Sequence, residues 1–319
     1  IYEYNDAQPV LVSAGMLLEN IRIAASHRGR TAEWQYRGTA GKDFLVDVTF
    51  PEAPAAERDE LRDFIPVRSV DRRPYQCTPL SPRHKAMLAD ALGPDLDLRY
   101  YETDADRRMI SHLNGRATDI RLRIREAFEV HRRVIDWDRL RSPTGIPCRA
   151  LGLNGATLKL MRWMMRDWKR AQMMNGLPGG TFLARYQMDY RPGRACSAHF
   201  MIGWKDAPDP EDRIPAIIRA GMAIQRFRLT ATKLGLAIQP SLATLIFGHY
   251  GQHGQAFTED QAIRAKAAEL AAALGQLGLG DLDRWLFMGR IGFPSVAQTG
   301  PRSIRRPLSE LMAGAEGDA

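Results

Sequence analysis

The segment from Arg68 to Arg73 carries side chains that could bind an anion. Arg68, Ser69, Arg72 and Arg73 place three guanidinium groups and one hydroxyl within six residues. Because a guanidinium makes paired, planar hydrogen bonds to phosphate or carboxylate, such a segment could hold either group. Asp71 would repel an anion there unless it forms an ion pair with one of the arginines. The alternative interpretation is a solvated basic turn at the end of a strand.

The sequence offers few other candidates for catalysis or metal binding. His249 and His253 in the stretch GHYGQHG are four residues apart, but its three glycines make a helix unlikely, so we expect no metal site. The chain contains neither a GxGxxG motif after a strand nor a GxxxxGK[ST] motif, which argues against dinucleotide-binding and P-loop sites. His112 and His131 lie in arginine-rich helical segments and are expected to be surface or core residues.

Composition and charge indicate a globular protein of a reducing compartment. The 319 residues are 45% hydrophobic and 26% charged, with a net charge of +8. No apolar run reaches the ~18–20 residues that a membrane span needs, and no secretory signal is visible at the N-terminus. The three cysteines are far apart and form no CxxC pair, so we expect a cytoplasmic protein without disulfides or zinc. Arginine-rich helices without interleaved aromatics make nucleic-acid binding unlikely.

Two helical segments of the chain resemble each other. AGMLLENIRIAASHRG (Ala14–Gly29) and AGMAIQRFRLTATKLG (Ala220–Gly235) are identical at six of sixteen positions. Each ends in a glycine and is followed by a short apolar or aromatic segment of strand type. One interpretation is a coincidence between two core helices. The other is a duplication, in which two related halves pack about an approximate two-fold axis.

The remaining pattern alternates helices with few strands and predicts an α+β fold. Strands are expected over 31–38, 43–50, 95–103, 195–204 and 282–294. Ser81 is positioned to cap a helix over 82–92, and Thr258 to cap a helix that follows it. A long helical pattern over 105–135 is expected to break near Gly115. The N-terminal residue is Ile1 rather than Met, so we expect a processed or truncated chain.

The segment from Thr157 to Asn175 is predicted to be one amphipathic helix. Its apolar face carries Leu158, Met161, Met164, Met165, Trp168 and Ala171. Basic side chains lie on the other face, which could indicate contact with a membrane surface or a partner. The favoured interpretation is packed core or a lid, because methionine fills irregular gaps in apolar cores.

Three stretches of the sequence resemble the nitroreductase-like flavoproteins. AGMAIQRFRLTATKLGLAIQP resembles the central helix of that family and the turn after it. VRSVDRRPYQCTPLSPRHKAMLADAL is similar to the opening motif of the family, and FMGRIGFPSVAQTGPRSIRRPLSEL to its closing motif. The likeness covers most of the chain from Ser13 to Leu311 and is nearest to the single-chain (Acg-type) branch. Related domains also occur fused to ThiF/MoeB-type adenylating domains.

The resemblance implies an architecture and a cofactor site. It implies a nitroreductase-like α+β fold with two related halves forming an intramolecular pseudo-dimer around the central helices. Residues 1–65 would form a first, partial half, and residues 66–319 a second half with an inserted helical lid near 140–180. FMN would be bound by Arg68, Ser69, Arg72, Arg73, Gln239, Pro240, Ser241, Arg302, Arg305 and Arg306. From the residues alone, the last three could instead be surface arginines of an exposed tail.

The resemblance also implies a reaction class. The chain would be an FMN-dependent oxidoreductase in which reduced nicotinamide, NAD(P)H, reduces an electron-poor small molecule. Hydride chemistry of this kind belongs to the cofactor, so no protein nucleophile is needed. The alternative is a non-catalytic domain that sequesters flavin or serves a ThiF/MoeB-type adenylating protein.

Overall fold

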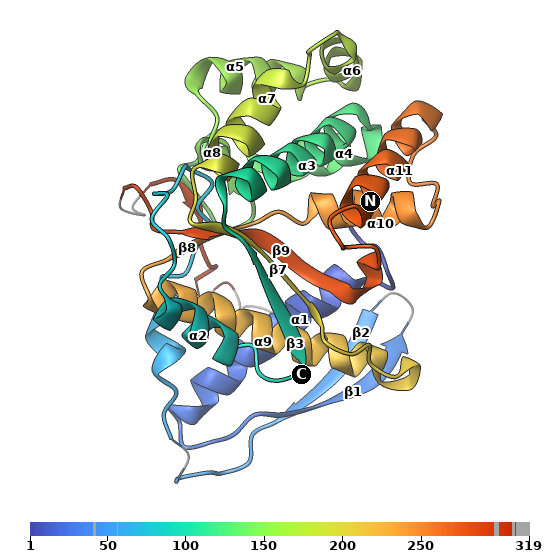
Figure 1. Ribbon diagram of the computed structural model, residues 1–319. Helices are drawn as coiled ribbons and strands as arrows, with labels where there is room; N and C mark the ends of the chain where they lie inside the picture. Colours follow the sequence, from blue (N-terminus) through green and yellow to red (C-terminus); the bar gives the residue numbers. More distant parts are fainter. Residues whose placement is uncertain (41–42, 56, 297–299, 308–309, 311–319) are drawn as a thin grey trace, which may run out of the picture.

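The computed structural model of the protein describes residues 1–40, 43–55, 57–296, 300–307 and 310. A four-stranded sheet lies between two layers of helices (Figure 1). Its order is β3-β7-β9-β8, and all neighbouring strands are antiparallel. The strands are β3 (Leu96–Tyr101), β7 (Ala198–Trp204), β8 (Ala237–Pro240) and β9 (Trp285–Gly292). The strands expected from the sequence in these regions are therefore confirmed.

The two faces of the sheet contribute to two separate apolar clusters. β7 and β9 are buried along their whole length, which explains their almost continuously apolar sequences. Successive side chains of β7 alternate, so Phe200 and Ile202 join the cluster beneath the sheet while Met201 joins the cluster above it. The sheet is thus the central layer of the molecule.

The layer beneath the sheet contains the two repeated segments. They form α1 (Gln8–Ser26) and α9 (Arg213–Lys233), which cross each other, with α2 (Pro82–Asp90) beside them (Figure 1). The Ser81 Oγ accepts a hydrogen bond from the backbone N–H of His84 at 3.1 Å, so the predicted cap of α2 is confirmed. β1 (Glu33–Ala40) and β2 (Asp43–Thr49) form an antiparallel hairpin whose apolar face packs on the same cluster.

The crossing of α1 and α9 is reciprocal. A Cβ atom on Gly15 would lie 2.0 Å from the carbonyl oxygen of Ile218, and one on Gly221 would lie 2.3 Å from that of Val12. These contacts join equivalent positions of the repeat, so the helix pair has a local two-fold relation. The two-fold relation does not extend to the strands that follow the two helices, because β1 and β2 form a separate hairpin whereas β8 joins the central sheet. A complete pseudo-dimer and the boundary at residues 65 and 66 stay predictions.

The layer above the sheet consists of α3 (Asp104–Arg123), α4 (Arg125–Val134), α10 (Ala243–Gln252) and α11 (Gln261–Gly275). Three sequence predictions are wrong here. The helix continues through Gly115 and breaks at Ile124 instead; Gly115 is required because a Cβ would lie 2.4 Å from the Tyr190 ring. Asp260, not Thr258, caps α11. The GHYGQHG stretch is helical as far as Gln252 in spite of its glycines, because α10 packs tightly against α3 and α11.

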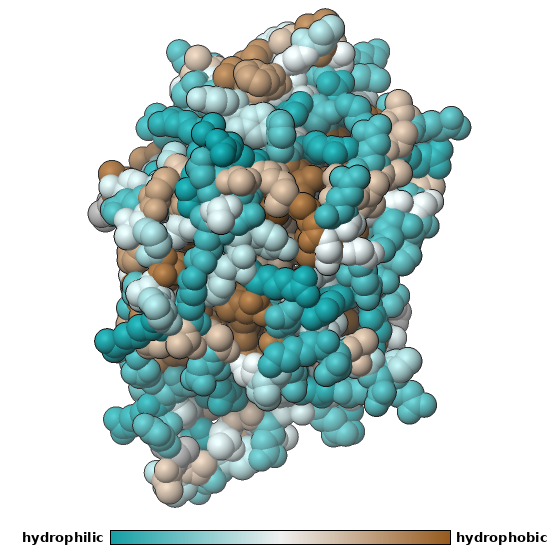
Figure 2. Space-filling model, viewed as in Figure 1, coloured by the Kyte–Doolittle hydropathy of each residue, from teal (hydrophilic) through white to brown (hydrophobic). Residues whose placement is uncertain are grey.

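A helical segment lies beyond α3 at the top of Figure 1. It contains α5 (Gly155–Met164), α6 (Trp168–Gly176), α7 (Phe182–Arg185), the π-helical turn η3 (Tyr186–Tyr190) and α8 (Arg191–Arg194). The single helix predicted over 157–175 is two helices, since Asp167 caps a new helix at Trp168. The predicted apolar face does pack inside the segment, around Phe128, Met165 and Ala171. Figure 2 also shows apolar surface over this segment, where Trp163, Phe182 and other large side chains are exposed.

Short elements complete the described chain. They are the helical turns η1 (Glu60–Phe64), η2 (Cys148–Leu151), η4 (Pro210–Asp212) and η5 (Leu282–Arg284), and the paired strands β4 (Ile135–Asp136) with β6 (Ile146–Pro147) and β5 (Arg141–Ser142) with β10 (Arg302–Ser303). Cys77, Cys148 and Cys196 are free thiols, as expected. Within the described ranges, every helix is too short or too polar to cross a membrane. Part of the closing stretch, 297–299, 308–309 and 311, lies outside the described residues.

Candidate functional site

A small cavity lies between the opening basic segment and the C-terminal half of α9. Its volume is about 130 Å³. The lining residues are Arg68, Ser69, Arg228, Thr232, Gly235, Leu236, Ile238 and Pro294. No carboxylate is among these described lining residues, whereas two guanidinium groups and two hydroxyls are. The cavity therefore has the composition of an anion site.

The arginines of this cavity are poorly neutralised by the fold. The Nε of Arg68 is buried and has no hydrogen-bond partner among the described residues. Arg228 donates from Nη1 to the Met16 sulfur at 3.1 Å, and a thioether is only a weak acceptor. A buried donor that lacks a good acceptor is costly, so an incoming anion would be favourable here.

Arg305 brings a third positive charge to the cluster. It donates from Nη1 to the carbonyl oxygen of Pro66 at 3.0 Å and from Nη2 to that of Ile65. Burial, with the charge of Arg305, lowers the pKa of Arg68 to about 10. Burial, with the charges of Arg68 and Arg305, lowers the pKa of Arg228 to about 9. All three stay protonated near pH 7 and repel one another. We call Arg68, Arg228 and Arg305 the arginine cluster.

A second cavity of about 60 Å³ adjoins the first through Ser69. Its lining includes the chain around Gly152, Asp71 and four arginines: Arg72, Arg73, Arg149 and Arg302. Burial lowers the pKa of Arg72, and the positive charges of Arg121 and Arg290 lower it further. Arg72 and Arg302, two of the predicted site residues, thus meet beside the arginine cluster rather than within it.

Asp71 and Arg73 neutralise each other. Arg73 donates from Nε to Oδ1 of Asp71 at 2.9 Å and from Nη2 to Oδ2 at 2.7 Å. Asp71 is buried, so this pair removes the repulsion that its carboxylate would exert on an anion. The same pairing occupies the guanidinium of Arg73, which the resemblance had assigned to the cofactor. Arg306, likewise assigned, is exposed at the surface.

Gln239, Pro240 and Ser241 lie at the end of β8 and have their main polar groups occupied. The Oε1 of Gln239 accepts a hydrogen bond from Nε of Arg290 at 2.7 Å. The backbone N–H of Ser241 donates to the carbonyl oxygen of Met288 at 2.8 Å, and Pro240 pairs with Gly289. These three residues support the sheet edge beneath Arg290, which is itself buried.

The structure therefore brings together part of the predicted site and adds one residue. Arg68 and Ser69 line the first cavity, and Arg305, from a distant part of the chain, lies close enough for its charge to act on Arg68. Arg228 was missed, because it lies between Phe227 and Leu229 in a helix that the sequence identifies as core. The sequence offered one signal, which is that Arg228 aligns with Arg22 in the two repeated segments. In the folded protein Arg228, unlike Arg22, faces the basic segment that carries Arg68.

The residues that line the first cavity fit the phosphate end of FMN. A carboxylate-free cavity with guanidinium and hydroxyl donors suits a phosphate group. The remainder of the cofactor does not fit, because the two adjoining cavities, about 130 and 60 Å³, are smaller than the ~300–1,000 Å³ of typical ligand pockets. A flavin ring would need the surrounding segments to move apart.

Comparison with known proteins yields structural likeness only. No protein-family model matches the sequence, and no curated protein matches it. A nitroreductase-like family protein from Bacillus cereus is 12% identical, with 80% of this chain and 96% of that chain covered and a TM-score of 0.40. An FMN-dependent nitroreductase from Clostridium difficile is 9% identical, covering 77% and 96%, with a TM-score of 0.35.

A third solved structure is similar to the same degree. It is the FMN-dependent nitroreductase NfnB from Mycobacterium smegmatis in complex with NADPH, 15% identical, covering 77% of this chain and 94% of that one, with a TM-score of 0.35. All three TM-scores are below 0.5. Fold and site by themselves define an α+β protein in which two partly buried arginines and one exposed arginine gather at the end of the central helix pair.

Proposed function

We propose that this chain is a nitroreductase-like flavoprotein whose arginine cluster binds the phosphate of FMN. The observation that carries the proposal is the carboxylate-free cavity between Arg68 and Arg228. The cluster gathers positive charge at a place where the described residues offer few good acceptors, and an incoming phosphate would supply them. The opening and closing motifs of the sequence, which resemble those of the family, contribute Arg68 and Arg305 to it.

The proposed activity is reduction of an electron-poor small molecule at the expense of NAD(P)H. When bound, the flavin would supply the hydride chemistry, and the chain would bind and orient it. The role of the arginine cluster is to hold the phosphate by charge-assisted hydrogen bonds. The identity of the acceptor and the choice between NADH and NADPH are not specified by these residues.

A second candidate is a protein that holds flavin without turning it over. The limited volume of the two cavities favours it, because a nicotinamide needs access to the ring as well. The variant of this candidate in which the chain serves a ThiF/MoeB-type adenylating protein rests on the sequence resemblance alone. Location in the cytoplasm likewise remains a prediction.

The visible absorbance spectrum of the purified protein separates these candidates. The flavoprotein predicts flavin bands that survive gel filtration, either in the protein as purified or after incubation with FMN. Bleaching of these bands by NADH or NADPH without oxygen identifies an oxidoreductase. Stable bands that neither nucleotide bleaches identify a holder, and a colourless protein that does not retain FMN contradicts both.

A further inference from the structure

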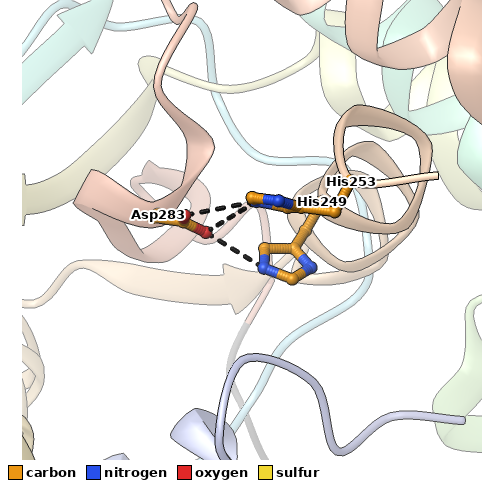
Figure 3. A group of neighbouring side chains, drawn as sticks. All are labelled: His249, His253 and Asp283. Atoms are coloured by element: carbon orange, nitrogen blue, oxygen red, sulfur yellow. Dashed lines mark hydrogen bonds and ion pairs between the residues drawn. The ribbon is translucent and has the colours of Figure 1, made fainter. Parts of the chain in front are cut away.

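His249, His253 and Asp283 form a compact group (Figure 3), and α10, which carries His249, lies on the face of the sheet opposite the α1–α9 pair (Figure 1). His249 lies in the last turn of α10, His253 follows directly after it, and Asp283 comes from η5. The two imidazole rings lie side by side, with centroids 4.3 Å apart, because residues four apart share one helix face. Both rings point toward the same carboxylate.

The distances within the group match those between ligands of one metal ion. The Nε2 of His249 lies 3.0 Å from Oδ1 of Asp283, and the Nε2 of His253 lies 3.2 Å from Oδ2. One ligand atom from each residue lies within 4.8 Å of the others. In a tetrahedral zinc site with bonds of 2.0–2.2 Å, neighbouring ligand atoms are about 3.3 Å apart. The two His–Asp separations are therefore close to those around a bound ion, and rotation of the exposed His253 ring would adjust the spacing between the two imidazole nitrogens.

The surroundings leave the group accessible from one side and anchored on the other. The side chain of His249 is 5% exposed, whereas those of His253 and Asp283 are 41% and 39% exposed. The Tyr4 ring packs edge-on against His249, with centroids 5.0 Å apart. Solvent can thus reach the group past His253 while the rest of it is held by the fold.

The neighbouring positive charge is already partnered. Arg213 acts on His249 through its charge, but its guanidinium donates to Oδ1 of Asn5 at 2.6 Å and lies 3.8 Å from a carboxylate oxygen of Asp6. The Asp283 carboxylate is therefore the charged group in direct contact with both imidazoles. Two imidazoles and one carboxylate suit borderline divalent transition metals better than Mg²⁺ or Ca²⁺.

We propose that His249, His253 and Asp283 bind a divalent transition metal of the zinc class, with water at the remaining position. Three protein ligands with an open position are the arrangement found in accessible zinc sites. The metal would join the end of α10 to η5, directly before the buried strand β9. The proposal is independent of flavin binding, since none of the three residues lines the two cavities near the arginine cluster.

The test is Zn²⁺ titration of the full chain, purified without a polyhistidine tag and stripped of metal by chelation. Isothermal calorimetry should show one saturable Zn²⁺ per chain, and Co²⁺ should give the visible absorption bands of a low-coordinate site. Zn²⁺ should also raise the melting temperature, because binding to the folded state alone stabilises it. Absence of saturable Zn²⁺ binding would overturn the proposal.

Three variants assign the binding to these side chains. His253→Gln and Asp283→Asn change exposed groups, so both should fold, and each should weaken Zn²⁺ binding by at least ~10–100-fold, the loss seen even for residues that only support ligands. His112→Gln removes an exposed histidine of α3 and serves as the matched control with unchanged affinity. Equal affinity in His253→Gln and His112→Gln would overturn the assignment.

Discussion

At the scale of single residues, Arg228 is the most informative side chain of this protein. It lines the first cavity with Arg68 and Thr232, and it donates a hydrogen bond to the Met16 sulfur, which is a weak acceptor. Its positive charge is therefore a cost to the folded state unless an anion is present. A partly buried cation with a weak acceptor carries a cost that an incoming anion would offset, which is typical of a binding site.

The cost of Arg228 gives a prediction for the variant Arg228→Met. In phosphate-free buffer at pH 7, its free energy of unfolding should exceed that of the native protein by about 1–3 kcal/mol, because a similarly sized apolar side chain replaces a buried cation. Millimolar phosphate should raise the melting temperature of the native protein but not of the variant. Thermal denaturation with and without phosphate measures both, and loss of stability in Arg228→Met would contradict the prediction.

The same residue predicts a pH dependence. Its pKa in the folded state, about 9, is below the ordinary value of an arginine, so the unfolded chain binds the proton more tightly. The penalty is therefore present in full below pH 9 and is relieved as pH rises above it. Phosphate binding has the opposite dependence and should weaken as pH rises through about 9.

At the scale of elements, the helix pair α1 and α9 depends on two glycines. Gly221→Ala would place a methyl group 2.3 Å from the backbone oxygen of Val12, which cannot move independently of α1. We expect the free energy of unfolding to fall by about 1–3 kcal/mol, as in other overpacked cores. Gly155→Ala in α5 is the control, because nothing lies within 4 Å of its added carbon. Chemical denaturation compares the two; equal stabilities would contradict the close crossing.

Asp119 joins three elements, α3, α11 and the helical segment above them. Its carboxylate receives hydrogen bonds from Lys266, Thr181 and Arg123. Burial alone would raise the pKa of Asp119, but these partners lower it to about 2. A lowered carboxyl pKa means stability that is complete above about pH 4 and is lost as pH falls through 2.

Asp119→Asn should therefore lower the free energy of unfolding by about 2 kcal/mol at pH 7, with the difference shrinking below pH 4. Asp138→Asn is the matched control, since its carboxylate is 78% exposed and its pair with Arg162 contributes little. Urea unfolding at a series of pH values measures the effect. A difference that persists unchanged at pH 2 would show that Asp119 acts through packing and not through its charge.

The sequence predicted elements well where one local signal decides them. The strands β1, β2, β3, β7 and β9 and the cap at Ser81 follow from alternation, apolar runs and capping chemistry. The predictions failed at Gly115 and in GHYGQHG, where tertiary packing outweighs the low helix propensity of glycine. The sequence analysis predicted three residues of the candidate site: Arg68, Ser69 and Arg305. It did not predict Arg228, because hydrophobic periodicity cannot distinguish an arginine that faces a cavity from a residue of the apolar core.

At the scale of the whole molecule, the candidate site depends on three distant parts of the chain. The basic segment after η1, the end of α9 and the C-terminal segment with Arg305 meet beside the sheet edge at β8. Val70 forms a bridge with Ile238, which fixes the opening segment to this edge. The overall architecture thus gathers like charges that no single element would place together.

The central claim is that the arginine cluster recognises the phosphate of FMN, and comparison of FMN with riboflavin tests it most directly. Fluorescence titration should show that the native protein and the control Arg219→Met, altered at an exposed arginine of α9, bind FMN about 10–100-fold more tightly than riboflavin, the value of charge-assisted hydrogen bonds. Arg228→Met should lose most of this preference. Equal affinity of the native protein for FMN and riboflavin would contradict the account.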